Sequence, residues 1–181
     1  HALLPDAVIL YTSDHGEGVG AHGLNHKGPA VYDEIARVPL IIAGPGLHQG
    51  EVYHHTVSHA DLPATVLDYM GLPVPGAFTG KSLLPGLQNG ESDAEGSAFV
   101  EFNRYERDHD GYQPMRAIVT DRYKLALHMT DQDELYDIQK DPWNLNNLID
   151  DPAYAQVRNQ LHDRILDWMN RTRDPFRGYQ W

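Results

Sequence analysis

The chain lacks several features, and each absence narrows what the protein can do. It has no cysteine, which excludes disulfide bonds and thiolate metal sites and leaves the redox compartment open. It has no apolar run of about 18 residues and no signal-peptide pattern, so no membrane partner is expected. Basic residues are few: 14 Lys and Arg against 26 Asp and Glu give a net charge of -12. This charge argues against a nucleic-acid partner, and a small anionic substrate would need a local basic pocket.

The composition is nevertheless that of a folded protein. With 181 residues, 41% of them hydrophobic, the chain can bury a core and form one domain, or one domain with a small appendage. The first residue is His1 rather than methionine, and a strand-like run begins almost at once. We therefore expect a fragment of a longer protein, with a processed mature protein as the alternative. The sequence indicates no particular compartment.

The first half of the chain has the pattern of an α/β fold. Residues 7–12 and 38–43 are short apolar runs that end in polar or glycine-rich turns, which is typical of strands buried on both faces. About 25 residues separate them, enough for a crossover, so we expect a parallel sheet. Asp61 is expected to cap a helix that ends at Gly71 and places Val66, Leu67 and Met70 on one face.

The second half indicates a small antiparallel sheet followed by a long helix. Residues 73–96 are rich in Gly, Pro and polar residues and are expected to form a long connection. We place a boundary there, dividing the chain into residues 1–95 and 96–181. Strands are expected at residues 97–103, 115–120 and 123–128. The closing helix, residues 153–173, is expected to be capped by Asp151 and to bury Val157, Leu161, Ile165, Trp168 and Met169.

The candidate site residues follow the first strand. Asp14 and His15 could give a carboxylate oxygen and an imidazole nitrogen to a divalent cation, although two ligands are too few for a closed site. On spacing alone, a capping turn is the favoured interpretation. Lys27 follows a glycine-rich stretch that could bring its ammonium over a bound oxyanion, but a solvated loop lysine is the usual case.

The remaining histidines are weaker candidates. His22 and His26 are four residues apart, but the glycines around them disfavour a helical metal site, so zinc is not predicted. His54, His55 and His59 are interpreted as exposed by chance. The charged and aromatic segment 101–110 could reach a substrate, and it is a weak signal.

Taken together, several segments closely resemble the second half of the sulfatase core of the alkaline-phosphatase-like superfamily, in the family's order and over nearly the whole chain. These segments are Thr12–Glu17, Lys27–Gly28, Asp33–Ile42, Ser58–Thr65, Arg122–Leu125 and Glu134–Asp137, followed by Asp141–Pro142 and Asn147–Leu148. The resemblance implies the C-terminal part of a mixed α/β sheet flanked by helices, plus a small antiparallel sheet with a long C-terminal helix.

The resemblance also implies roles for individual residues. Asp14 and His15 would be metal ligands, Lys27 would contact the sulfate or its leaving-group oxygen, and His26 would face the substrate. The cation would be calcium, with manganese or magnesium as alternatives. The family's formylglycine nucleophile arises from a Cys/Ser-x-Pro-x-Arg motif, which this chain does not contain. We therefore expect the nucleophile to lie upstream in a missing N-terminal half, and the fragment alone to be inactive and to self-associate through the exposed sheet edge.

Two other functions stay open. Many sulfatases carry Asn where this chain has His15, and a histidine there also resembles phosphonate monoester hydrolases and related phosphodiesterases of the same superfamily. Imidazole makes a transition metal such as manganese more plausible beside calcium. The other possibility is a noncatalytic binding or scaffold module with a degenerate site. The favoured hypothesis is a sulfatase acting on sulfate esters, with sugar sulfates as the suggested substrates.

Overall fold

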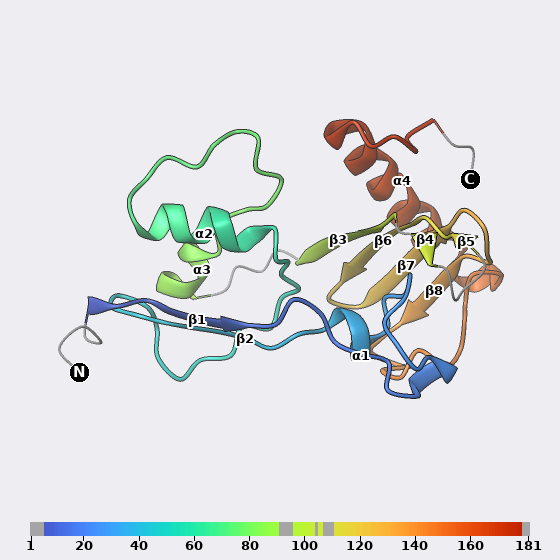
Figure 1. Ribbon diagram of the computed structural model, residues 1–181, viewed down its shortest axis with the longest axis horizontal. Helices are drawn as coiled ribbons and strands as arrows, with labels where there is room; N and C mark the ends of the chain where they lie inside the picture. The colour runs from blue at the N-terminus through green and yellow to red at the C-terminus, as the bar shows by residue number, and fades with distance from the viewer. Residues whose placement is uncertain (1–5, 91–95, 104, 107–110, 179–181) are drawn as a thin grey trace.

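The computed structural model describes residues 6–90, 96–103, 105–106 and 111–178. It contains two lobes, each with its own sheet (Figure 1). The first lobe has β1 (Ile9–Thr12) and β2 (Leu40–Ala43), together with the helices α2 (Asp61–Tyr69) and α3 (Leu84–Asn89). The second has a four-stranded antiparallel sheet in the order β3 (Ser97–Phe102), β6 (Met115–Thr120), β7 (Tyr123–His128) and β8 (Glu134–Asp137). A short ribbon pairs β4 (Tyr105–Glu106) with β5 (Gly111–Tyr112).

β1 and β2 pair antiparallel, so the parallel arrangement expected from the sequence is wrong. Ile9 lies opposite Ala43, and Thr12 lies opposite Leu40. The β1–β2 connection, residues 13–39, contains only the one-turn helices η2 (Ala21–Gly23) and α1 (Asp33–Ala36). It extends over the second lobe and returns to the end it left, which reverses the direction of β2 (Figure 1).

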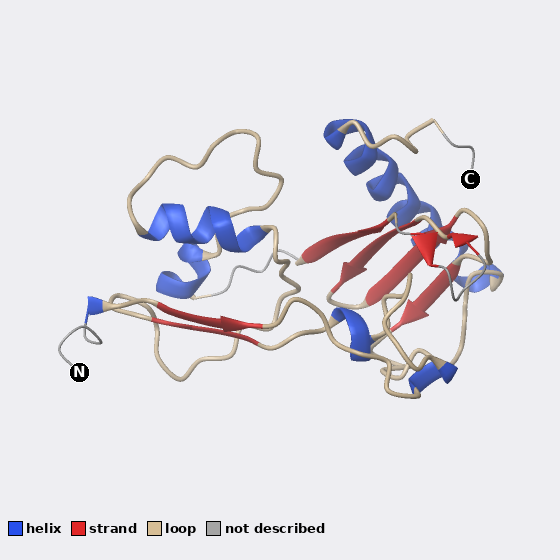
Figure 2. Ribbon diagram, viewed as in Figure 1, coloured by secondary structure: helices blue, strands red, loops and turns tan. Residues whose placement is uncertain are grey.

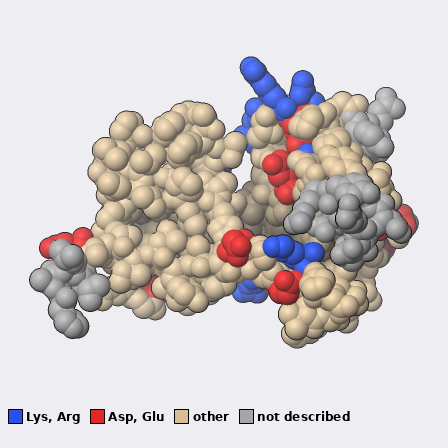
Figure 3. Space-filling view, in the orientation of Figure 1, with Lys and Arg blue, Asp and Glu red and all other residues tan. Residues whose placement is uncertain are grey.

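The strands of the first lobe are also not buried on both faces. Ile9, Tyr11 and Ile41 share one face and are 51%, 59% and 60% exposed. Few charged side chains appear on this lobe in the view of Figure 3, whereas Lys, Arg, Asp and Glu gather on the second lobe. An exposed apolar sheet face is typical of a surface that another segment or molecule covers.

The expected helix after residue 60 is confirmed, but Asp61 is its first residue rather than its cap, and two residues of the expected apolar face are exposed. α2 ends before Gly71, whose positive φ of 68° suits glycine. Asp61 is the first helical residue, and its carboxylate accepts hydrogen bonds from the backbone N–H groups of Ser58 and Lys81. The helix buries Ala64 and Thr65, while Val66 and Met70 are 41% and 64% exposed. α3 forms inside the segment, residues 73–96, that was expected to be a long connection.

The second lobe has its main core between the sheet and α4 (Ala155–Thr172). The expected cap is confirmed, because the Asp151 carboxylate accepts the Ala153 N–H at the start of a 3₁₀ turn, Pro152–Tyr154. Leu161, Ile165 and Met169 are buried against Ile118, Leu125, Leu127 and Leu135 from the strands, and Val157 and Trp168 pack at the margin. β8 was not anticipated as a strand. Figure 2 shows α4 lying across one face of this sheet.

The β1–β2 connection covers the opposite face of the same sheet. Val31 packs there against Met115, Ala117 and Ala126. The four-stranded sheet is therefore enclosed between α4 and a segment that begins and ends in the first lobe. The proposed boundary between residues 95 and 96 stays a prediction, since residues 91–95 lie outside the described part of the chain. No helix in the described ranges has the length and apolar character needed to cross a membrane.

Candidate functional site

Asp14 and His15 lie directly after β1, where the chain leaves the two-stranded sheet. The Asp14 side chain is 83% exposed and that of His15 is 36% exposed. The Asp14 carboxylate accepts the His15 backbone N–H at 2.9 Å, and its other oxygen lies 3.4 Å from His15 Nε2. The hydrogen bond from the His15 backbone N–H holds the pKa of Asp14 below its usual value. The carboxylate is therefore ionised and open to solvent.

The His15 ring is oriented by its own neighbourhood. Its Nδ1 lies 2.7 Å from the Gly16 carbonyl, so Nδ1 carries the proton and donates to that oxygen. This tautomer leaves the lone pair on Nε2. Lys27 Nζ contacts His15 Nε2, which places an ammonium group beside the imidazole and the carboxylate. The sequence prediction that Asp14, His15 and Lys27 belong together agrees with this arrangement, and their chemical roles stay predictions.

The donor set fits part of a divalent-cation site. Two ligands at right angles on one cation are separated by about 2.8–3.7 Å when each metal–ligand distance is about 2.0–2.6 Å. The 3.4 Å between the Asp14 oxygen and His15 Nε2 is within this range. An ionised carboxylate and a neutral imidazole are the required chemical states, and Lys27 Nζ would have to leave His15 Nε2 for a cation to bind there. No group of three or more potential ligands occurs within the residues that the structure describes, so further ligands would have to come from elsewhere.

Gly16 connects this pair to the second lobe. Its N–H donates to the Ile35 carbonyl of α1 at 2.8 Å. A Cβ at this position would lie 1.9 Å from the Glu34 carbonyl oxygen, so a side chain here would clash with α1. Glycine is needed because the backbone of α1 approaches so closely.

Polar contacts hold the start of α1 on the four-stranded sheet. The sequence analysis did not connect these residues with the candidate site. Lys124 from β7 contacts Asp33, and Tyr32 Oη donates to the Glu134 carboxylate of β8 at 2.8 Å. Burial alone would raise the pKa of Asp33, but Lys124 and Arg37 outweigh burial and lower it. Burial and the Glu134 carboxylate together raise the pKa of Tyr32. The phenol therefore remains protonated and keeps donating.

The other histidines are distributed over separate places. His26 is exposed, and within the described ranges no hydrogen bond or ion pair joins it to Asp14, His15 or Lys27. His22 stacks on the Tyr32 ring with centroids 3.7 Å apart, which makes it part of the anchor of α1. Its φ is 52°, a conformation that few non-glycine residues adopt.

Two histidines that were interpreted as exposed by chance have structural partners. His55 Nδ1 lies 2.7 Å from the Asp121 carboxylate in the turn between β6 and β7. His59 Nε2 lies 3.4 Å from Thr12 Oγ1, near the end of β1. Sequence spacing could not reveal either contact, because both partners are far away along the chain. The interrupting segment 101–110 lies partly outside the described residues, and its substrate contact stays a prediction.

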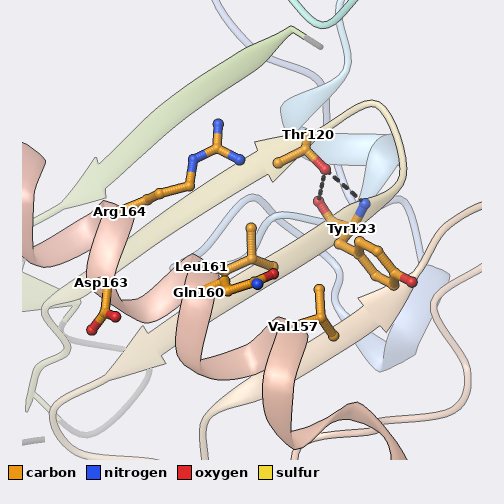
Figure 4. A pocket seen from close by; sticks show the side chains of 7 residues that line it. All are labelled: Thr120, Tyr123, Val157, Gln160, Leu161, Asp163 and Arg164. Atoms are coloured by element: carbon orange, nitrogen blue, oxygen red, sulfur yellow. Dashed lines mark hydrogen bonds between the residues drawn. The ribbon is translucent and has the colours of Figure 1, made fainter.

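Two hollows near α4 lie away from Asp14, His15 and Lys27. One, of about 450 Å³, lies between α4 and the β6–β7 turn and is lined by Thr120, Tyr123, Val157, Gln160, Leu161, Asp163 and Arg164 (Figure 4). The Thr120 hydroxyl there accepts the Tyr123 N–H at 2.9 Å and stabilises the turn. The candidate site itself is an open strand end, since the Asp14 side chain is 83% exposed.

Comparison with known proteins identifies the family. The profile described as "N-sulphoglucosamine sulphohydrolase, C-terminal" matches residues 20–171. The chain belongs to this family. It is 46% identical over 176 residues to the uncharacterized sulfatase YidJ of Escherichia coli (strain K12), covering 96% of this chain and 34% of that protein. It is 31% identical over 177 residues to a Δ4,5-hexuronate-2-O-sulfatase of Bacteroides thetaiotaomicron, covering 96% of this chain and 37% of that protein.

The fold agrees with the same superfamily. The crystal structure of the phosphonate monoester hydrolase of Agrobacterium radiobacter superimposes with a TM-score of 0.77 and 30% identity, over 91% of this chain and 35% of that one. The sulfatase-family chain thus spans little more than a third of the length of the relatives it matches, and it corresponds to their C-terminal part. The expected fold class, the C-terminal part of a sulfatase-type α/β protein with an antiparallel sheet and closing helix, is confirmed.

Proposed function

We propose that this chain is the C-terminal part of a sulfatase that hydrolyses sulfate esters, with sulfated sugars as the substrate class. The observation that carries the proposal is the junction of an ionised carboxylate, an imidazole and an ammonium that contacts its Nε2, all at one strand end. The family match over residues 20–171 supports it, and the name of the hexuronate-2-O-sulfatase supports a sugar sulfate.

In the intact enzyme, Asp14 and His15 would supply two ligands of the divalent cation, calcium or alternatively manganese or magnesium. The cation, when bound, supplies positive charge that polarises the sulfate oxygens. Lys27 would bind the sulfate and stabilise the negative charge that shifts to its oxygens or to the leaving-group oxygen. His26 would face the substrate from the same connection. A formylglycine nucleophile would come from the remainder of the enzyme, since this chain holds no Cys/Ser-x-Pro-x-Arg sequence.

The test compares an aryl sulfate and an aryl phosphodiester as substrates of the intact enzyme and of its Asp14→Ala variant. Asp167→Ala, which removes an exposed carboxylate from α4, is the matched control. We expect sulfate turnover that disappears in Asp14→Ala and persists in Asp167→Ala. A drop of at least about a hundredfold is expected, because the change removes a ligand and leaves the imidazole alone.

Hydrolysis of phosphonate monoesters or phosphodiesters is the second candidate. The histidine at position 15 and the similarity to a phosphonate monoester hydrolase favour it, since a cation and an ammonium stabilise either oxyanion. Preferential turnover of the diester would support this alternative. Turnover of neither substrate, together with no cation binding, would overturn both enzymatic proposals and favour a noncatalytic binding module.

A further inference from the structure

Lys124 has no role in the proposed chemistry, yet it is one of the most completely buried side chains in the described residues, with 2% of its surface exposed. Its Nζ donates to the Val31 carbonyl at 2.8 Å, to Asp33 Oδ1 at 2.5 Å and to Asn144 Oδ1 at 3.0 Å. A buried ammonium is costly unless it is paired and its three protons are used. All three are used here: Asp33 is the first residue of α1, and Val31 lies two residues before it.

α1 in turn contacts the residue that follows the candidate metal ligands. Ile35 accepts the Gly16 N–H at 2.8 Å, and the Glu34 carbonyl lies against the Gly16 Cα. Gly16 then orients the ligand itself, because its carbonyl accepts the proton on His15 Nδ1 at 2.7 Å. Direct contacts therefore run from β7 through α1 and Gly16 to the imidazole.

We propose that Lys124 is a positioning residue for the Asp14–His15 pair, an inference that rests on the proposed function of that pair. The buried ammonium fixes the height of α1 above the four-stranded sheet. The position of α1 then sets where the Gly16 carbonyl lies and hence the orientation of the His15 ring. Groups that orient a metal-binding histidine through its second nitrogen typically change metal affinity about 10- to 100-fold when they are removed.

The structure offers a control that separates positioning from general stability. Arg116, in β6 on the α4 face of the sheet, is 1% exposed and forms an ion pair with Asp174, with Nε–Oδ2 at 2.6 Å. Lys124 and Arg116 are both buried cations of the same sheet, each paired with a carboxylate. Only Lys124 contacts α1. Arg116→Met leaves the buried Asp174 carboxylate without its partner, and Lys124→Met leaves the buried Val31 and Asn144 acceptors without a donor, so both changes are expected to destabilise the fold.

The experiment measures Mn²⁺ and Ca²⁺ affinity of the intact enzyme by calorimetric titration, together with hydrogen exchange at the Gly16 amide. Lys124→Met is expected to weaken cation binding about 10- to 100-fold and to speed exchange at Gly16. Arg116→Met is expected to lower the thermal midpoint without changing either quantity. Asp33→Asn, which keeps an oxygen acceptor for Lys124, provides a milder variant if Lys124→Met does not fold, and it is expected to give a smaller loss in the same direction.

The outcomes are distinguishable. Unchanged cation affinity in Lys124→Met, or in Asp33→Asn if that is the variant that folds, would overturn the positioning role. An equal loss in Arg116→Met would also overturn it, because lost stability would then explain the effect. A wild-type enzyme that binds neither cation would instead refute the proposed function on which the inference rests.

Discussion

Gly16 is a position near the candidate ligands where the structure predicts a large effect of a single methyl group. In Gly16→Ala the new Cβ would lie 1.9 Å from the Glu34 carbonyl oxygen, whereas real Cβ atoms keep at least about 3.0 Å from such an atom. Either the chain after β1 or α1 must therefore move by about 1.1 Å. The movement breaks the 2.8 Å hydrogen bond from the Gly16 N–H to Ile35. Overpacking costs about 1–3 kcal/mol and the lost hydrogen bond about 1 kcal/mol, so we expect destabilisation by about 2–4 kcal/mol.

The same movement displaces His15, and a misplacement of about 1 Å in an active site costs about a hundredfold in rate. Chemical denaturation and aryl-sulfate turnover of the intact enzyme measure the two effects separately. Gly76→Ala is the control, since a Cβ there meets nothing within 4 Å and no positive φ is needed. Wild-type stability and turnover in Gly16→Ala would refute the argument that α1 backs the site.

Two further predictions concern the contact between the lobes and the exposed sheet face. Burial would raise the pKa of Asp121, but hydrogen bonds from His55, Thr56 and Gly96 outweigh burial and lower it to about 2. Because the folded pKa lies below the unfolded value, this stabilisation is complete above about pH 4 and is lost as the pH falls through 2. Asp121→Asn is therefore expected to cost about 1–2 kcal/mol at neutral pH and to flatten the acid limb of a pH–stability curve, an effect that Asp167→Asn should not reproduce. The isolated 181-residue chain is expected to self-associate through Ile9, Tyr11 and Ile41, and Tyr11→Lys is expected to shift its sedimentation toward that of a monomer. A wild-type chain that sediments as a monomer at high concentration would contradict this prediction.

The parts of the fold that follow from local patterns were predictable. The helix after Asp151 has its cap, its proline and apolar residues at helical spacing in one continuous stretch, and the structure confirms it. The strands on either side of the tight turn at Asp121 likewise carry local signals. The direction in which β1 and β2 pair could not be predicted from local patterns. The run Ala7–Thr12 looks like a buried strand, but its direction relative to β2 depends on where the intervening residues pack.

The sequence predicted which residues of the candidate site could be ligands, but not which residues hold them in position. Asp14, His15 and Lys27 were recognised because they lie close together in sequence and match the family's motifs. Lys124 was not recognised as a supporting residue, because an isolated lysine inside an apolar strand has no local signal that shows what it contacts. Its partner Asp33 is 91 residues away, and Tyr32 is 102 residues from Glu134.

Those sequence separations have a consequence for how the protein is made. During synthesis Asp14 and His15 leave the ribosome long before β7 and β8, whose side chains hold α1 on the four-stranded sheet. Closing a loop of about 90 residues costs entropy before any contact compensates for it, so α1 cannot be held in place until the strands of the second lobe have emerged. The nascent chain therefore carries its ligand pair in an unsupported form until β7 and β8 have been synthesised.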